Sequence, residues 1–354
     1  MKILFVMEPR YEAGSIQAIV NYIRVGEQLG HTIAVYGKPC FEHPGLRFST
    51  EVGAFDYTLW IYESNLFWPK RLQFAHIVAE APRRRRIVFD ADGMYNPLMV
   101  VDGYDCNHFS EDDRKEWLTH FEALGDRVFQ PTLDKPKEPR ARAVPFYGYD
   151  PGQVIKEDEA PRKVFDIALV GHNWWRWEQV SKCLLPSLEK IRSRVGEICF
   201  IGFWWDAVQE WAQSTPWEAA YRVDPERLRR LGIQVKPPVR FQDVVWTMSQ
   251  ARINIMTQRP LLRHLRHLTS KYFECFCADT VPLVMIDAEH GEQVYGPAGT
   301  ELSMDGQIGD KLLEILAHPS LYREHVNSIR QHLEARHSYR TRVSELIAAL
   351  QAES

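Results

Sequence analysis

A dense group of basic side chains follows the apolar segment Arg252–Thr257, which reads as a strand. In an open α/β sheet ligands bind beyond the carboxyl ends of the strands, so a group in this place is well positioned to hold an anion. Guanidinium and ammonium groups are common partners of phosphate oxygens. The group has four cations within thirteen residues, interleaved with His264 and His267: Arg259, Arg263, Arg266 and Lys271.

Glu274 follows this group inside a predicted helix that begins at Thr269 or Ser270. The free N–H groups at a helix start favour an anion such as a diphosphate. A carboxylate one turn further in can accept hydrogen bonds from two ribose hydroxyls. Ser270, Lys271 and Glu274 therefore fit a nucleotide site. The spacing leaves one alternative open: the cations form a solvated helix face, and Glu274 pairs only with Lys271.

Two successive α/β patterns surround these residues. The first has a helix from Ser15 to Gly30 and apolar strands at 2–7, 32–37, 57–62, 86–89 and 126–130. The segment 131–163 is rich in proline and charge, which predicts an interdomain linker. The second pattern has strands at 165–171, 197–202, 233–239, 252–257 and 281–286. We predict an α/β protein with two doubly wound Rossmann-like domains, 1–150 and 151–335, and a C-terminal helix, 336–354, that packs back on the first.

Several common catalytic and nucleotide-binding motifs are absent from the sequence. It contains no GxGxxG fingerprint after the first strand, no GxxxxGK[ST] loop and no GxSxG elbow. Asp90-Ala91-Asp92 fits the DxD string that can hold a divalent metal, but no other ligand cluster accompanies it. We therefore predict neither a metal site nor a cofactor.

The composition is that of an ordinary globular protein. A formal net charge of -4 and a pI near 6.4 argue against a nucleic-acid binder that relies on a global positive field. No run approaches the ~20 apolar residues of a membrane helix, and the N-terminal apolar run is too short for a signal peptide. The six cysteines form no CxxC pair, which favours neither disulfides nor zinc. We expect a cytoplasmic protein without a transmembrane segment.

The stretch from about 233 to 350 resembles the C-terminal half of spore-maturation-protein-like GT-B glycosyltransferases, a branch of the family-4-related group. The run Ser270–Val284, with Lys271-Tyr272-Phe273-Glu274 near its start, is similar to the family's donor helix. The run His337–Val343 resembles the motif before the family's closing helix, and Gly299–Leu302 stands where the family often has a glycine and an acidic residue. The resemblance covers about a third of the chain. Asp279 departs from it, because the family usually has glycine there.

The resemblance implies a GT-B fold, in which two Rossmann-like domains face a central cleft, and a nucleotide diphosphate sugar as donor. Glu274 would contact the ribose, and Lys271 with Arg263 or Arg266 the diphosphate. The strand-end loop Gly171-His172-Asn173 would face the donor phosphates, with Arg176 as the nearby cation and Trp174, Trp175 and Trp177 in packing roles. The predicted donor site comprises Gly171, His172, Asn173, Arg176, Arg259, Arg263, Arg266, Ser270, Lys271 and Glu274.

Two segments of the first domain resemble the acceptor side of GT-B enzymes: the loop Glu8–Ser15 and the strand end Asp90–Asn96. An acidic or imidazole group of the first domain would orient or deprotonate the acceptor. The candidates are Asp92, Asp90 and His108 for catalysis, and Glu12, Gly14 and Tyr95 for acceptor binding. The alternative is structural, because an aspartate after a strand commonly makes a turn or caps a helix.

The sequence thus predicts a glycosyltransferase that moves a sugar from a nucleotide diphosphate sugar to an acceptor. The acceptor is a small molecule, a glycan or a protein, and not a nucleic acid. By analogy with relatives that have this helix, we expect a retaining, metal-independent reaction. Two alternatives remain: a nucleotide-sugar epimerase of the same fold, and a catalytically silent nucleotide-sugar-binding protein.

Overall fold

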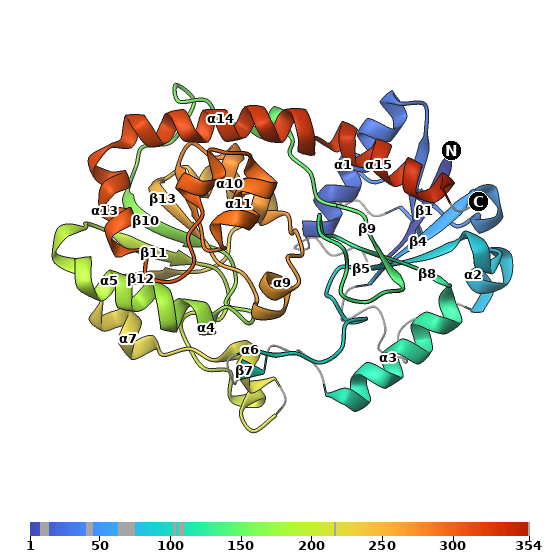
Figure 1. Ribbon diagram of the computed structural model, residues 1–354, viewed down its shortest axis with the longest axis horizontal. Helices are drawn as coiled ribbons and strands as arrows, with labels where there is room; N and C mark the ends of the chain where they lie inside the picture. The colour runs from blue at the N-terminus through green and yellow to red at the C-terminus, as the bar shows by residue number, and fades with distance from the viewer. Residues whose placement is uncertain are drawn as a thin grey trace. The chain divides into compact units, whose positions relative to one another are not determined.

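The structure is a computed structural model that describes residues 1–7, 14–39, 45–62, 75–101, 104–105, 110–215 and 217–352. The chain divides into two compact units (Figure 1). Unit 1 comprises Met1–Gly148, His264–Ser270 and Tyr339–Ser354, and unit 2 comprises Tyr149–Arg263 and Lys271–Ser338. The sequence-based boundary lies at residue 150. The segment 264–270, which the sequence analysis placed in the second domain, is a part of unit 1.

Unit 1 is built on a parallel sheet of seven strands among the residues described, in the order β3-β2-β1-β4-β5-β8-β9. A two-stranded antiparallel pair, β6 (Val100–Val101) and β7 (Tyr104–Asp105), lies outside this sheet. The strands of the main sheet are β1 (Lys2–Val6), β2 (Thr32–Tyr36), β3 (Phe48–Ser49), β4 (Tyr57–Tyr62), β5 (Arg86–Asp90), β8 (Arg127–Gln130) and β9 (Ala141–Ala143).

Helices cover both faces of this sheet. Successive side chains of a strand point to opposite faces, and β1 shows the result. Ile3 and Phe5 join a core with α1 (Gly14–Gln28) and α15 (Tyr339–Gln351). Leu4 and Val6 join a core with α2 (Ala75–Glu80) and α3 (Glu111–Leu124). Figure 1 shows α15 beside α1, so the end of the chain completes the core of unit 1.

The first part of the predicted linker is not a linker. Residues up to Gly148 belong to unit 1, and β9 pairs in parallel with β8 at the edge of the sheet. Phe146 is buried, and its ring stacks on Tyr22 with 5.1 Å between centroids. The prolines and charged residues of this segment suggested a linker. A short edge strand of three residues forms without a continuous apolar run, so the pattern did not reveal β9.

Unit 2 has a parallel sheet of five described strands in the order β12-β11-β10-β13-β14. The chain starts in the middle at β10, fills one side and then returns to the other side of β10. The strands are β10 (Phe165–Val170), β11 (Ile198–Ile201), β12 (Ile233–Lys236), β13 (Ala251–Met256) and β14 (Val281–Val284). The order therefore reverses between β10 and β13, which is the point where doubly wound sheets bind ligands.

The helices of unit 2 connect and cover these strands. A continuous helical stretch after β10 includes a π-helical turn, Val180–Leu184. Its neighbours in that stretch are α4 (Trp177–Gln179) and α5 (Leu185–Ile191). The others are α6 (Glu218–Tyr221), α7 (Pro225–Arg230), α8 (Val244–Met248), α9 (Pro260–His264), α10 (Lys271–Cys277), α11 (Ala288–Tyr295), α12 (Gly299–Leu302), α13 (Gly309–Ala317) and α14 (Pro319–His337).

Candidate functional site

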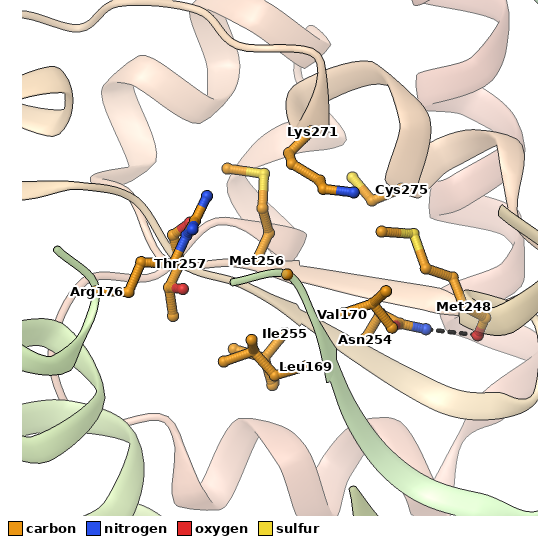
Figure 2. A pocket seen from close by; sticks show the side chains of 11 residues that line it. Leu169, Val170, Arg176, Met248, Asn254, Ile255, Met256, Thr257, Lys271 and Cys275 are labelled. Atoms are coloured by element: carbon orange, nitrogen blue, oxygen red, sulfur yellow. Dashed lines mark hydrogen bonds between the residues drawn. The ribbon is translucent and has the colours of Figure 1, made fainter. Parts of the chain in front are cut away.

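A pocket in unit 2 lies where β10 and β13 end, at the reversal of strand order (Figure 2). The carboxyl ends of these two predicted strands therefore lie side by side, as the doubly wound topology requires. Figure 2 shows Lys271 and Cys275 reaching the pocket from α10. The lining residues are Leu169, Val170, Gly171, Arg176, Met248, Asn254, Ile255, Met256, Thr257, Lys271 and Cys275.

Two cations line this pocket, Lys271 and Arg176. The Arg176 Nε lies 3.3 Å from the carbonyl oxygen of Thr257, and its guanidinium also donates to the carbonyl of His172. Burial, with the charge of Arg259, lowers the pKa of Arg176 to about 10. Arg176 is thus still protonated at neutral pH, and no carboxylate of the described residues pairs with it. The pocket is electropositive and suits an anion.

Glu274 lies on α10 next to Lys271 and is 4% exposed. Its Oε2 is 2.9 Å from the Lys271 Nζ, so the ion pair left open by the sequence is present. Among the residues that the structure describes, however, neither carboxylate oxygen has a hydrogen-bond partner of good geometry. A carboxylate offers about four lone-pair sites, and burying them without donors costs free energy. Glu274 therefore has the capacity to accept hydrogen bonds from a ligand.

Two further buried polar groups stand at the end of β13. The hydroxyl of Thr257 and the side-chain amide of Gln258 find no hydrogen-bond partner within the described part of the chain. Neither residue was predicted as a site residue from the sequence. Their position directly after a buried strand was the signal that could have found them, because they follow the same strand end as Arg259.

His172 is neutral in the folded protein. Its Nδ1 accepts the backbone N–H of Phe203 at 3.1 Å, so the neutral ring carries its proton on Nε2. Burial, with the charges of Arg176 and Lys271, lowers the pKa of His172 from 6.5 to about 4. His172 can therefore donate a hydrogen bond from Nε2 at neutral pH, but it carries no charge there.

The pKa of His172 predicts a pH-dependent stability. Between pH 6.5 and 4 the unfolded chain binds a proton at His172 and the folded chain does not, so its contribution to stability falls as the pH drops through this window. Asp90, whose pKa burial raises from 3.8 to about 6, acts in the opposite direction over a similar range. The variant His172→Gln isolates the histidine: we expect it to lose less stability than wild type between pH 7 and pH 5 in urea unfolding. Equal losses in the two proteins would contradict the assignment, and His120→Gln, at an exposed site on α3, is the matched control.

The remaining loop residues after β10 have different roles. Apart from its two neighbours in the chain, no described residue has an atom within 4 Å of the place where a side chain on Gly171 would begin, which leaves this backbone open to a ligand. Asn173 is fully buried, and its amide donates to the carbonyls of Trp204 (2.9 Å) and Arg222 (2.8 Å). Asn173 therefore holds the following loop in place, whereas it was predicted to touch the donor.

Two of the predicted donor-binding arginines are engaged elsewhere. The Arg263 guanidinium lies 3.2 Å from Asp305 and 3.9 Å from Glu178. Arg266 belongs to unit 1, where its guanidinium lies 3.4 Å from Asp134. Arg259 stays a candidate, because its charge contributes to the lowered pKa of Arg176. Of the four cations, Lys271 is the one that lines the pocket.

The segment His264–Ser270 is fixed within unit 1. The Leu268 N–H donates to the Pro131 carbonyl at 2.6 Å, and His267 forms a bridge with Thr132. Leu265 packs against Gly93, which has φ of +75° and no room for a side chain. Ser270 lies against Gly14, where an added Cβ would be 2.5 Å from its hydroxyl. Gly14 and Ser270, predicted for the acceptor and donor respectively, are thus neighbours.

The predicted catalytic and acceptor-binding residues of unit 1 have different environments. Asp90 is fully buried and accepts hydrogen bonds from the N–H groups of Met94 and Tyr95 and from Gln130, so it fixes the turn after β5. Tyr95 is 2% exposed and belongs to the core around Phe121. Asp92 lies in the same turn with 9% of its surface exposed. Glu12 and His108 lie outside the described residues.

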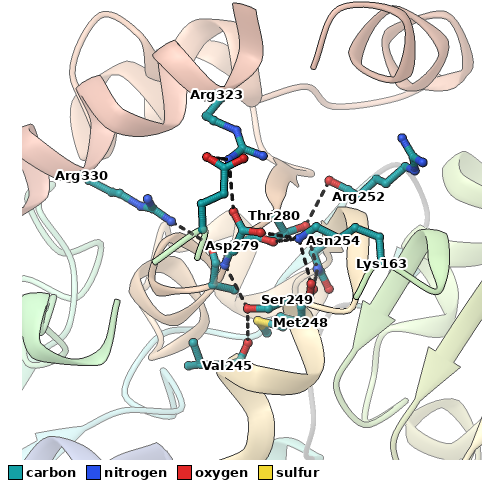
Figure 3. A network of polar contacts seen from close by, with 12 residues as sticks. Lys163, Val245, Met248, Ser249, Arg252, Asn254, Asp279, Thr280, Arg323 and Arg330 are labelled. Atoms are coloured by element: carbon teal, nitrogen blue, oxygen red, sulfur yellow. Dashed lines mark hydrogen bonds and ion pairs between the residues drawn. The ribbon is translucent and has the colours of Figure 1, made fainter. Parts of the chain in front are cut away.

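Asp279, which departs from the glycine of the resembling family, is the centre of a polar network (Figure 3). Its carboxylate lies 2.7 Å from the Lys163 Nζ and 3.6 Å from Arg323, and its N–H donates to the Ser249 hydroxyl. Asp279 is not among the described non-glycine residues with positive φ, so glycine is not required there. Asp279 in place of glycine therefore adds contacts at the start of β14 and does not strain the turn.

The network predicts that Asp279→Ala destabilises the protein. Removing the carboxylate leaves the partly buried Lys163 without its ion-pair partner, which should lower the free energy of unfolding by about 2 kcal/mol. Urea unfolding measures this change. Glu226→Gln removes one partner of an exposed ion pair on α7 and should change stability by less than about 0.5 kcal/mol. If both variants are equally stable, the network does not stabilise unit 2.

Comparisons with known proteins agree with this architecture. Residues 187–348 match a sequence family described as glycosyl transferase-like. The β-glucosyltransferase of T4 phage, solved with UDP-glucose, aligns with a TM-score of 0.57 and 13% identity over 100% of this chain and 99% of that chain. This chain has the GT-B fold. The expected fold and the expected enzyme class, glycosyltransferase, are confirmed by these matches.

Two further solved structures show the same GT-B fold. An α-glucosyltransferase in complex with UDP and a 13-mer DNA aligns with a TM-score of 0.64 and 11% identity over 99% of both chains. A glycosyltransferase involved in avilamycin A biosynthesis aligns with a TM-score of 0.56 and 13% identity over 99% of this chain and 97% of that chain. A comparison with curated proteins finds no match.

Two features are absent from the described residues. No helix among them has both the length and the apolar character needed to cross a membrane. They also contain no group of three or more His, Cys, Asp or Glu side chains arranged to hold a metal ion.

Proposed function

We propose that this GT-B glycosyltransferase uses a UDP-sugar as donor and binds it in the pocket of unit 2. The observation that carries the proposal is a pair of cations that line the pocket, Lys271 and Arg176, with the buried carboxylate of Glu274 beside Lys271. Apart from this ion pair, the Glu274 carboxylate accepts no hydrogen bond of good geometry from the described residues. The cations suit a diphosphate, and the carboxylate suits ribose hydroxyls. UDP and UDP-glucose are the ligands of two similar structures, which supports uridine as the base.

The chemistry follows from the charges. When the bond from the sugar C1 to the diphosphate breaks, negative charge grows on the leaving phosphate and the sugar becomes oxocarbenium-like. Lys271 and Arg176 are fixed near the strand ends before the reaction, so they stabilise this charge without reorganising. His172 adds a neutral N–H donor at the same loop. Retention of configuration, metal independence and membership of the spore-maturation-protein-like branch belong to the proposal.

The base that deprotonates the acceptor is proposed from the residues of unit 1. Three hydrogen bonds engage the Asp90 carboxylate, which argues against Asp90 as the base. Asp92 stays a candidate base at the same turn. His108 and Glu12 stay candidates from the sequence alone. Although one similar structure contains DNA, we retain the expectation that the acceptor is not a nucleic acid, since the pI is near 6.4. A cytoplasmic location is part of the same proposal.

A donor screen tests this function. Thermal shift with UDP-, GDP-, ADP- and dTDP-sugars should show the largest rise in melting temperature for a UDP-sugar, because a ligand that binds only the folded state stabilises it. Incubation with that donor should release UDP, at equal rates in EDTA and in Mn²⁺. A converted UDP-sugar without release would indicate an epimerase, and binding without any turnover would indicate a silent binding protein.

A further inference from the structure

The segment between β11 and α7, together with Trp174 of the loop after β10, carries a cluster of aromatic rings in unit 2. We call it the aromatic platform; it consists of Trp174, Phe203, Trp204, Trp211, Trp217 and Tyr221. Tyr221 is central, with ring centroids 4.9 Å from Trp204 and 4.8 Å from Trp211. Trp211 is nevertheless 59% exposed and Phe203 37% exposed. Packing therefore explains the inner rings but leaves the two outer ones facing solvent.

The aromatic platform contacts the loop after β10, of which Gly171 lines the pocket. The Phe203 ring lies 4.8 Å from the His172 ring, and its N–H donates to the His172 Nδ1. The indole of Trp205 donates to the carbonyl of Gly171 at 2.7 Å, and Gly171 lines the pocket. A ligand on the platform would thus lie on the same loop system that borders the proposed donor site.

The backbone around the platform is strained. Trp175, Trp204 and Ser214 have φ of 58°, 66° and 59°, a region that residues with a Cβ rarely adopt. Asn173 holds the strained loop through its hydrogen bond to the Trp204 carbonyl, and the Trp175 N–H donates to Ala220. Such strain costs free energy, persists only where surrounding contacts enforce it, and concentrates at ligand-binding sites.

The charges of the segment 203–222 indicate which kind of ligand can stack on the aromatic platform. The sequence 203–222 contains three carboxylates and one cation, Asp206, Glu210, Glu218 and Arg222. Arg222 lies 3.7 Å from Glu218, and Asp206 and Glu210 are exposed. Such a surface repels phosphate and sulfate. Its carboxylates can accept hydrogen bonds from hydroxyls, and the electron-rich ring faces suit the C–H faces of a sugar.

We infer that the aromatic platform binds an uncharged carbohydrate, and that the acceptor of this glycosyltransferase is therefore a neutral glycan. The second half of this inference rests on the proposed function. Trp211 supplies the exposed stacking face, and Asp206 and Glu210, which are exposed on the same segment, supply hydrogen-bond acceptors. A phosphate-rich acceptor such as DNA has no cationic surface to meet on this loop.

The test begins with the full chain on an array of neutral and anionic glycans. The best neutral ligand is then titrated into wild type, Trp211→Ala, Trp211→Phe and Trp246→Ala, and UDP is titrated into the same four proteins. Trp246 is the matched control, because it is a 47% exposed tryptophan on α8, outside the platform. We expect Trp211→Ala to weaken glycan binding about tenfold, Trp211→Phe to retain most of it, and Trp246→Ala to change nothing.

The two titrations separate the two claims. UDP should bind all four proteins equally. If wild type binds UDP but no neutral glycan, or binds only anionic glycans or duplex DNA, the inference is wrong and the proposed function stands. If glycan binding is equally weak in Trp211→Ala and Trp246→Ala, the platform is not the site. If the glycan binds through Trp211 and UDP binds nowhere, the platform is supported and the donor assignment fails.

Discussion

Replacing Lys271 with methionine is expected to lower kcat/KM for the UDP-sugar about a hundredfold. Lys271 is one of two cations that line the pocket, and its charge would meet the leaving diphosphate. Losing one preorganised charged donor to such a group raises the barrier by about 3 kcal/mol, which corresponds to roughly this factor. Binding of UDP should weaken as well, whereas binding of uridine, which lacks phosphate, should not change.

A fold defect is the competing explanation for such a loss, because Lys271→Met leaves Glu274 buried beside an apolar chain. The double variant Lys271→Met/Glu274→Gln removes both charges and should restore the melting temperature without restoring activity. Lys156→Met, at an exposed lysine of unit 2, is the matched control and should retain full activity. If Lys271→Met binds UDP as tightly as wild type, the diphosphate is not held by Lys271.

Glu274→Gln is expected to weaken the binding of UDP about thirtyfold. The proposed ribose contact makes two charge-assisted hydrogen bonds, and a neutral amide can replace neither at full strength. Removal of the ribose 2′-hydroxyl tests this contact specifically. Wild type should bind UDP more tightly than 2′-deoxy-UDP, and Glu274→Gln should bind the two nucleotides about equally. Isothermal titration of both nucleotides into both proteins measures the coupling free energy between Glu274 and the 2′-hydroxyl.

The control for this experiment is Glu292→Gln, an exposed carboxylate on α11 of the same unit. It should leave both affinities unchanged. A variant at Glu274 that keeps the wild-type preference for UDP over 2′-deoxy-UDP would show that Glu274 is only the ion-pair partner of Lys271.

Local sequence patterns were sufficient to predict the strands and the helix that form the site. The buried apolar runs predicted β10 and β13, and the pattern of Ser270–Glu274 predicted α10 within two residues of its observed start at Lys271. Strand order in a doubly wound sheet then brings the loop after β10, the end of β13 and α10 together. Gly171, Arg176 and Lys271 line the pocket for this reason.

Contacts between distant segments were beyond the reach of local patterns. Arg263 and Arg266 are paired with Asp305 and Asp134, which lie 42 and 132 positions away in the sequence. The segment 264–270 belongs to unit 1 because of Leu265 at Gly93 and Leu268 at Pro131, and neither contact leaves a periodic signal. Likewise, Asn173 stands at the predicted strand end, yet its side chain is directed to the carbonyls of Trp204 and Arg222.

A crystal structure of the full chain with UDP is the most direct test of the donor site. The account predicts that the β-phosphate lies within hydrogen-bonding distance of the Lys271 ammonium, with Arg176 nearby, and that the ribose hydroxyls donate to Glu274. UDP bound away from the ends of β10 and β13, or bound there with its phosphates directed away from Lys271 and Arg176, would contradict it.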